Sequence, residues 1–368
     1  GYPLLCIAAS NGDSLTVAKL LDEGANIEQT NLNLTGGTPL QEAAEKGHAA
    51  VVSLLLDRGA KIESFGGRSS NALHLAVRGA FQTVVALLLD SGANVNAVDM
   101  ENSKRTALHR AVGWGDHLIS LLLDHGADLE ARDFHEMTPL HVAVTTAEPD
   151  CAVLLLERGA DIEAVDKESA TALHLAAAEG DIGCIALLLD RGAKIDAAET
   201  KSSLTPLHHT VLNDLITAAT YLLERGANVD ARRDDDVTSL HLAAKFNCLS
   251  IIKVLLERGA DIEASDDTGW SPLRFAASVG NLDAAKCLLQ HGADISHRAV
   301  DAISLSPLHH AAADDYPETG KLLVQCGADF EAGDDDGWTA LRCTSTNVEG
   351  TYPSPEEATN DEFAEYLL

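Results

Sequence analysis

The stretch Thr138-Pro139-Leu140-His141-Val142-Ala143-Val144 decides the fold, because its residue types fit successive positions of one short helix. Thr138 can cap the helix, and Pro139 suits its first turn, where no amide donor is needed. Leu140 and Ala143 are three residues apart and therefore share a face, on which the small Ala lets another helix approach closely. The stretch predicts a short helix with one tightly packed side.

A second helix and a stop signal follow this stretch. Residues 151–156 (Cys-Ala-Val-Leu-Leu-Leu) predict an apolar helix, and Gly159 can adopt the left-handed conformation with which many helices end. Residues 160–164 (Ala-Asp-Ile-Glu-Ala) are expected to be extended and turn-like, and to lead through Asp166 to the next cap. One unit is therefore two helices and a connecting loop.

The same unit recurs along nearly the whole chain of 368 residues. Gly-Ala pairs that end the second helix recur at intervals of 33 to 35 residues, starting at Gly24, Gly59, Gly92, Gly126, Gly159, Gly192, Gly226, Gly259, Gly292 and Gly327. The Leu of the first helix recurs independently, at Leu5, Leu40, Leu73, Leu108, Leu140, Leu173, Leu207, Leu240, Leu273, Leu308 and Leu341. Two markers with one period indicate a repeat architecture. We expect a single array of about eleven repeats, near residues 1–33, 34–67, 68–101, 102–134, 135–167, 168–200, 201–234, 235–267, 268–301, 302–335 and 336–368.

These strings resemble the ankyrin repeat, and the resemblance covers nearly the whole chain. It implies an all-α fold, an ankyrin-repeat solenoid whose repeats each contribute two antiparallel helices and a β-hairpin loop. It also implies that the His in the TPLH-like string bonds to the backbone of neighbouring hairpins; these residues are His74, His109, His141, His174, His208, His241 and His309. The repeats are similar in style to long arrays in fungal multi-ankyrin proteins.

The two ends of the chain lack the polar cap that usually closes a repeat array. The sequence begins directly at a first helix and stops inside the second helix of the last repeat, so we expect it to be a piece of a longer protein. Residues 344–360, with Pro353 and Pro355, predict an inserted loop between the two helices of that repeat.

Composition limits the kinds of partner and compartment. The formal charge is −31, so phosphate is repelled and no nucleic-acid partner is expected. The same charge favours a basic protein or peptide, although acids also keep a long stack soluble. No run of eighteen apolar residues occurs, so no membrane insertion is expected. The seven cysteines form no CxxC pair and predict a cytoplasmic, reducing location, with neither disulfides nor a metal site.

Acid–Arg pairs recur directly before the Gly of the second helix. They are Asp57-Arg58, Glu157-Arg158, Asp190-Arg191, Glu224-Arg225 and Glu257-Arg258. Because repeats stack, we expect these residues to form columns of salt bridges on the outer face, each of small energetic weight.

Residues that depart from the repeat are the candidates for binding. The residue two after the first-helix Leu and the residue four later are predicted to line a concave groove, as Glu42/Lys46, Arg110/Trp114, Val142/Thr146, Leu175/Glu179, His209/Asn213, Leu242/Phe246, Phe275/Val279 and His310/Asp314. The hairpin tips add Arg68, Lys104, Arg105, Phe134, His135, Lys167, Asp234 and Asp235. Trp270 and Trp338 also lie at tips, but each precedes a cap and is interpreted as packing on the next hairpin.

The leading hypothesis for function is a protein–protein interaction scaffold that binds a partner across the groove of repeats 4–8, without a cofactor. The predicted contact residues are Trp114, Phe134, His135, Thr146, Glu179, Asn213 and Phe246, because exposed aromatics are enriched at binding hot spots. The alternative is an enzyme or a small-molecule-binding protein that uses acid/base pairs on the groove, namely His209 with Asp214 and His310 with Asp314. No nucleophile elbow, phosphate loop or metal spacing accompanies these pairs.

Overall fold

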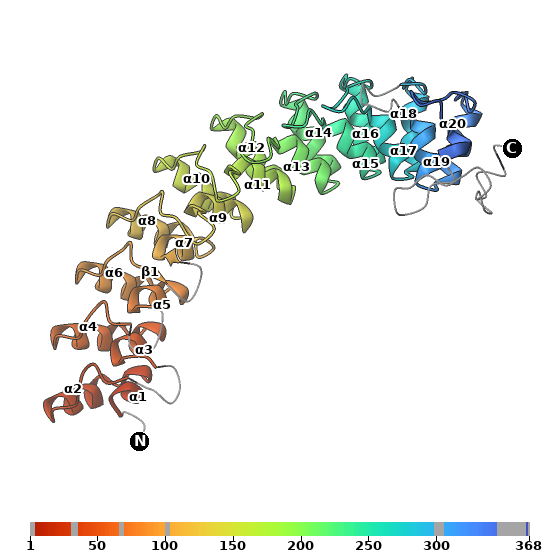
Figure 1. Ribbon diagram of the computed structural model, residues 1–368. Helices are drawn as coiled ribbons and strands as arrows, with labels where there is room; N and C mark the ends of the chain where they lie inside the picture. Colours follow the sequence, from red (N-terminus) through yellow and green to blue (C-terminus); the bar gives the residue numbers. More distant parts are fainter. Residues whose placement is uncertain are drawn as a thin grey trace. The chain divides into compact units, whose positions relative to one another are not determined.

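Helices in pairs make up almost all of the regular structure (Figure 1). The computed structural model describes residues 4–30, 36–65, 70–99, 104–297, 305–343 and 366. Arg68 and the loop predicted at residues 344–360 lie outside this range. The first helices of the repeats are α1 (Leu4–Ser10), α3 (Pro39–Glu45), α5 (Ala72–Arg78), α7 (Ala107–Ala111), α9 (Pro139–Thr145), α11 (Ala172–Glu179), α13 (Pro206–Leu212), α15 (Ser239–Lys245), α17 (Pro272–Ser278), α19 (Pro307–Ala313) and α21 (Ala340–Cys343).

Each first helix up to α19 is followed by a second helix of nine residues. These second helices are α2 (Ser14–Asp22), α4 (Ala49–Asp57), α6 (Gln82–Asp90), α8 (Asp116–Asp124), α10 (Pro149–Glu157), α12 (Ile182–Asp190), α14 (Ile216–Glu224), α16 (Leu249–Glu257), α18 (Leu282–Gln290) and α20 (Pro317–Gln325). The predicted all-α fold and its two-helix period are confirmed. Helix α21 begins the last predicted repeat, and its expected partner helix lies outside the described residues.

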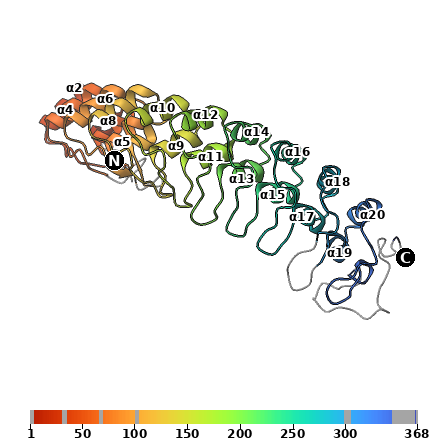
Figure 2. The ribbon, with the colours of Figure 1, turned by 90° about the horizontal axis from the view of Figure 1, so that it is seen from above.

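The chain divides into two compact units, and each is described by itself. Unit 1 is residues 1–175 with 186–193, and unit 2 is residues 176–185 with 194–368. In each unit a first helix contacts the second helix of its own repeat and the first helix of the next repeat, as α3 does with α4 and α5, and α17 with α18 and α19. In unit 2 the connecting loops project beyond the first helices (Figure 2). The single array spanning all repeats stays a prediction.

The connecting loops contain little regular β-structure. Strands β1 (Val98–Asp99) and β2 (Arg105–Thr106) form an antiparallel hairpin, whereas Val165–Thr171, Arg232–Thr238 and Gly333–Thr339 each form a single bridge. The shorter turns are closed by a side chain: Asp166 Oδ1 accepts from the backbone N–H groups of Glu168 and Ala170, at 2.9 Å each. The predicted hairpins are therefore correct in position but mostly too short for a ladder of paired residues.

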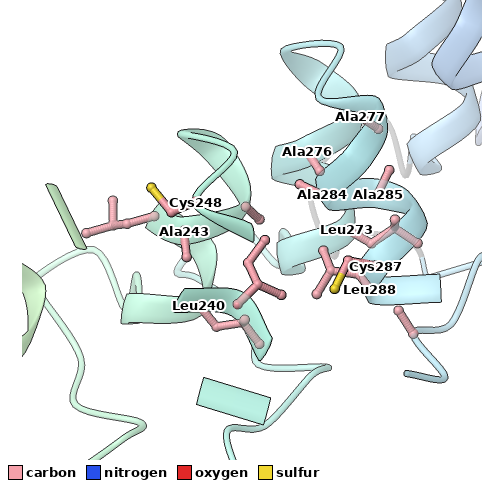
Figure 3. Close-up of a cluster of buried hydrophobic side chains, with 14 of the residues drawn as sticks. Leu240, Ala243, Cys248, Leu273, Ala276, Ala277, Ala284, Ala285, Cys287 and Leu288 are labelled. Atoms are coloured by element: carbon pink, nitrogen blue, oxygen red, sulfur yellow. The ribbon is translucent and has the colours of Figure 1, made fainter. Parts of the chain in front are cut away.

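Small residues let the helices pack closely, as the low aromatic content predicts. In unit 2, Leu240 and Leu273 are at most 1% exposed, and Ala243 and Ala276 on the same helices are fully buried (Figure 3). All seven thiols are free, and each is buried except that of Cys326, so the interpretation of cysteines as small hydrophobes holds for six of them.

In four repeats a histidine links the cap to the next repeat. The backbone N–H of Thr138 donates to His141 Nδ1 over 3.1 Å, and His141 Nε2 lies 3.2 Å from the carbonyl oxygen of Ala170, 29 residues further on. Because a carbonyl only accepts, the proton sits on Nε2. The same bond to the following loop is made by His109, His241 and His309, so the role that the family resemblance implies is confirmed for these four residues, whereas Nε2 of His74 and of His208 is buried without a hydrogen-bond partner among the described residues. Gln41 replaces His in its repeat and reproduces the link with its amide, which accepts from Thr38 N–H and donates to the carbonyls of Phe65 and Ser70.

Neighbouring repeats also fit together through a matched pair of residues. The turn before a second helix contains one residue with positive φ, and the residue that precedes the next second helix packs on it. Where the turn residue is Gly, the packing residue is large; the pairs are Gly12 with His48, Gly47 with Phe81, Gly180 with Leu215, and Gly280 with Tyr316. Where the turn residue carries a side chain, the packing residue is smaller: Cys248 follows the turn at Asp214, and Asn281 follows the turn at Asn247.

We expect Gly47→Ala to destabilise unit 1 more than Gly59→Ala. Both glycines have positive φ, +76° and +85°, so both variants carry the cost of about 1–2 kcal/mol for a left-handed Ala. Only at Gly47 would the new Cβ lie 2.5 Å from the ring of Phe81, whereas at Gly59 it meets nothing within 4 Å. The extra cost is about 1–3 kcal/mol. Urea unfolding measures both variants, and equal losses would contradict the packing role of Phe81.

Stability is expected to fall as the pH drops below 6.5. Desolvation by burial lowers the pKa of five histidines of the TPLH-like strings below the ordinary 6.5, and lowers that of His208 to about 4; the others are His74, His109, His141 and His241. Between pH 6.5 and the lowered pKa values, the unfolded chain binds protons that the folded chain does not bind. The contribution of these histidines to stability is therefore fully present above pH 6.5 and declines below it, by roughly 1.4 kcal/mol per pKa unit of difference.

The matched control is His208→Gln, because Gln41 shows that an amide can serve at this position. This variant should flatten the decline of the urea midpoint between pH 6.5 and 4, where His208 contributes. An unchanged slope would mean that other groups cause the decline.

Candidate functional site

The three predicted aromatic contacts are exposed. Trp114, Phe134 and Phe246 are 53%, 57% and 52% accessible, so none of them belongs to the core. Trp114 and Phe246 follow the first helices α7 and α15, whereas Phe134 lies in the loop before α9. The other predicted contacts, His135, Thr146, Glu179 and Asn213, are also exposed. Large apolar rings on the surface are what a binding hot spot requires.

Two of the polar contacts already bond to their own helix. Thr146 Oγ1 donates to the carbonyl of Val142 over 2.8 Å, and Asn213 Nδ2 donates to the carbonyl of His209 over 3.1 Å. Both residues are C-caps, and their side chains satisfy carbonyls that the helix end leaves open. Their hydrogen-bonding capacity toward a partner is therefore reduced.

The predicted groove pairs are wrong for three first residues, which are buried. The second residue of a pair is exposed in Lys46, Trp114, Thr146, Glu179, Asn213, Phe246 and Asp314. The first residue is buried in Glu42, Val142 and Leu242, at 5% exposure or less. The reason is the close packing of adjacent first helices, which covers the position near the loop and leaves the far end of each helix open.

Unit 1 brings Phe134, His135 and Lys167 together at adjacent loop tips. The rings of Phe134 and His135 meet edge to face at 5.5 Å, and Lys167 Nζ lies 5.6 Å from the centre of the Phe134 ring. Lys167 N–H donates to the carbonyl of His135 over 3.0 Å, which fixes the two tips side by side. Phe134 is thus a positioned aromatic with a cation beside it.

The seven predicted contacts fall in both units. Trp114, Phe134, His135 and Thr146 belong to unit 1, and Glu179, Asn213 and Phe246 belong to unit 2. One continuous groove across repeats 4–8 stays a prediction, and the surface of each unit is treated separately below.

Trp270 and Trp338 are half-buried, and each stacks on an Arg of its own repeat. The guanidinium of Arg274 lies 4.3 Å from the Trp270 ring centre, and that of Arg342 lies 3.7 Å from the Trp338 ring centre. Each Arg replaces the His of the TPLH-like string, and the carbonyl of each Trp accepts from the His of the preceding repeat. The packing interpretation of both Trp residues is supported. Both repeats that have Trp before the cap also have Arg in place of His in the TPLH-like string. This paired substitution is the sequence signal from which the stacking could have been predicted.

The acid/base pair predicted at His209 has a different acid. His209 Nε2 lies 2.8 Å from Glu199 Oε1, and Glu199 is 6% exposed and also accepts from Ser202 Oγ. Asp214, the predicted partner, is exposed on a left-handed turn beyond the helix end. Glu199 lies 10 residues before His209, and Asp99 lies 11 residues before Arg110 in a similar pairing. Both acids begin the longer loops of the chain, which they tie to the following helix.

His310 packs on an aromatic ring. Its imidazole centre lies 4.6 Å from that of Trp270. Asp314 is the C-cap of the same helix, and burial raises the pKa of its carboxyl above the ordinary value. The predicted His310–Asp314 pair stays untested as a catalytic site.

Most acids of the repeated Gly-Ala-Asp-Ile-Glu string are structural. Asp161 Oδ1 accepts from Glu163 N–H at 2.9 Å, and Glu130 Oε1 accepts from the backbone N–H of Asp161 in the next repeat at 2.7 Å. We call the second type of bond the inter-repeat clamp; its acceptors are Glu28, Glu63, Asn96, Glu130, Asp196, Asp230 and Glu263. These acids carry part of the −31 charge for reasons unrelated to a partner.

The predicted acid–Arg columns are present on the second helices. Arg58, Arg158, Arg191 and Arg258 each pair with an acid one repeat earlier, at 2.8 to 3.5 Å. His125 takes the place of Arg in its repeat and lies 3.2 Å from Asp90. These pairs are exposed and contribute little individually.

Among the described residues, no three His, Cys, Asp or Glu side chains gather in a way that could hold a metal ion. In that same part of the chain, no helix has both the length and the apolar character needed to cross a membrane.

Comparison with known proteins agrees with the repeat pattern. The family model described as ankyrin repeats in three copies matches residues 5–99, 97–166, 159–233 and 229–299, and the single ankyrin-repeat model matches residues 305–335. The crystal structure of the human ASB11 ankyrin repeat domain is similar, with a TM-score of 0.53 and 24% identity, over 63% of this chain and 96% of that one. No curated protein sequence matches the chain.

We expect Glu130→Ala to destabilise unit 1 by about 1 kcal/mol, because the variant removes one clamp hydrogen bond between repeats. The control is Glu179→Ala, which removes an exposed acid outside the clamp and should change stability by less than about 0.5 kcal/mol. Urea unfolding midpoints measure both. Equal effects would show that the clamp acids act only through their charge.

Proposed function

Because this chain belongs to the ankyrin-repeat family, whose repeats form protein-interaction modules, we propose that it binds a protein partner through the far ends of its first helices and through its loop tips. The contacts are Trp114, Phe134, His135 and Thr146 in unit 1 and Glu179, Asn213 and Phe246 in unit 2. The observation that carries the proposal is the exposure of Trp114, Phe134 and Phe246 in a chain with only 4% aromatic residues.

The three exposed rings lie outside the cores of the two units. Cores of both units are built from Leu, Val, Ile and Ala, and aromatic residues that serve packing, such as Phe81 and Trp270, lie against Gly or Arg partners. Trp114 and Phe246 instead occupy the same repeat position, at which other repeats have Lys46, Thr146 or Asn213. A ring that is half exposed leaves apolar area in water, which a partner can cover.

Preorganisation supports binding at these positions. The clamp and the His links fix each loop to the next repeat, and Lys167 and His135 fix the orientation of Phe134. A surface that is ordered before binding loses little conformational freedom when a partner arrives, so more of the contact energy appears as affinity. A location inside the cell, where thiols stay reduced, accords with seven free cysteines.

The test is capture of partners from a native extract with the wild-type chain and with Trp114→Ala, Phe134→Ala and Phe246→Ala. Each variant at a true contact should weaken binding of a captured protein by more than about 2 kcal/mol, roughly thirtyfold, because aromatic hot spots dominate interfaces. The thermal unfolding midpoint should stay nearly unchanged, since the rings are exposed.

Leu15→Ala serves as the control, because Leu15 is 83% exposed and lies on α2, away from the first helices. It should leave capture unchanged. Loss of the same captured protein with Leu15→Ala, or retention of every captured protein in all three aromatic variants, would overturn the proposal. Comparing Trp114→Ala with Phe246→Ala shows which unit holds a given partner.

A further inference from the structure

The two units present different charges at equivalent positions. In unit 2, exposed acids that lie outside the clamp occupy the loop tips, at Asp234, Asp236, Asp267, Asp335 and Asp336. More exposed acids occupy the far ends of the first helices, at Glu179, Asp214, Asp314 and Asp315. Acids therefore outnumber exposed cations on both borders of the first-helix surface of unit 2, where Lys201 and Arg232 lie in the loops and Lys245 ends α15.

Unit 1 mixes both signs at the same positions. Its loop tips carry the exposed cations Lys104, Arg132 and Lys167 beside Glu136 and Glu168. Its first-helix ends carry Lys46, and Arg78 forms an ion pair with Glu45 of the preceding repeat at 2.5 Å. The excess of acid at the binding positions thus belongs to unit 2 and is not a property of the repeat.

Two of the loop cations of unit 2 are held by residues of their own or the next loop. Arg233 lies 3.2 Å from Asp235, and Arg232 lies 3.7 Å from Asp236 and donates to the carbonyl of Ser265 in the next loop. Asp267 N–H donates to the carbonyl of Asp235, which holds adjacent tips in register. The acids of these two loops are therefore held beside one another.

Apolar side chains lie between these borders. Phe246 is 52% exposed and Leu212 is 38% exposed, at the ends of α15 and α13, which contact one another. A first helix here is seven residues long, so its two ends lie about 10 Å apart; three or four extended residues span that length, and further residues reach the projecting tips. One short segment can therefore contact both the apolar pair and the acidic tips.

We propose that the Leu212–Phe246 surface of unit 2 binds a basic protein segment, with an apolar side chain on Phe246 and Leu212 and with Lys or Arg directed to the loop tips around Asp234 and Asp267. The inference rests on the proposed function and specifies the partner class for one unit. Opposite charges steer the encounter and exclude acidic competitors, while the apolar contact provides the anchor.

The experiment measures binding of three fluorescent peptides of about twelve residues to the full chain by anisotropy, at low and high salt. The first peptide has two Leu followed by spaced Lys, the second has Glu in place of Lys, and the third has Ser in place of Leu. The Leu–Lys peptide should bind at least about tenfold more tightly than either of the others, and its affinity should fall with salt.

Variants place the peptide on the surface. Phe246→Ala should weaken the Leu–Lys peptide about tenfold at both salt concentrations, and Asp234→Asn with Asp267→Asn should weaken it mainly at low salt. The matched controls in unit 1 are Leu15→Ala and Glu136→Gln with Glu168→Gln, which should leave its affinity unchanged.

Each other outcome overturns the inference in a recognisable way. Equal binding of the Leu–Lys and Ser–Lys peptides would show general attraction to an acidic chain. Preference for the Leu–Glu peptide, or no binding of any peptide, would exclude a basic partner here. In those cases the capture experiment with Trp114, Phe134 and Phe246 variants still decides the proposed function independently.

Discussion

The hydrogen-bonded link from a helix cap through an imidazole to the next loop is the contact on which each unit depends. Thr138 and His141 show both halves of this link. Thr138 donates its backbone N–H to one ring nitrogen of His141, and the other ring nitrogen donates to a carbonyl oxygen 29 residues further on. One side chain thus ends a helix, fixes a loop and joins two repeats. Because the ring is buried and bonded through both nitrogens, the link works only with a neutral imidazole or an amide such as that of Gln41.

The helices and their caps could be predicted from the sequence because they depend on local rules. A Thr-Pro pair starts a helix, a Gly ends one, and a period of about 33 residues tells which copies correspond. The structure of the loops is harder to predict from the sequence. The number of residues between Asp166 and Thr171 decides whether strands can pair, and here hydrogen bonds from backbone N–H groups to a side chain replace the β-ladder. The roles of Gln41 and Arg274, which stand where other repeats have His, could not be predicted, because Gln41 acts through the loop of the next repeat and Arg274 through the ring of Trp270.

The exposure of the candidate contact residues could be predicted from the sequence, whereas the burial of neighbouring first-helix positions could not. Trp114 and Phe246 stand out because nothing in the repeat requires a ring at that position, and both are exposed. Burial of Glu42 and Val142 could not be read from helix periodicity, since it comes from the adjacent first helix. The same holds for the acid that pairs with His209. The loop before its helix is one residue longer than the usual spacing, so that Glu199 reaches the imidazole ring. Contacts between repeats decide these cases, and a single repeat does not encode them.

The matched turn and packing residues have a consequence for how such a chain can change length. Repeat arrays grow and shrink when whole copies are duplicated or lost, and this is simplest when every copy fits every neighbour. Here a copy that carries Phe81 fits only behind a turn that ends in Gly, as at Gly47, and behind Asp214 or Asn247 its ring would meet a side chain. Each repeat therefore fits only beside neighbours whose turn and packing residues are compatible with its own. Recombination between distant copies would be filtered by this fit, so inherited changes in repeat number should favour blocks whose junction pairs a Gly with a large residue or a side chain with a small one.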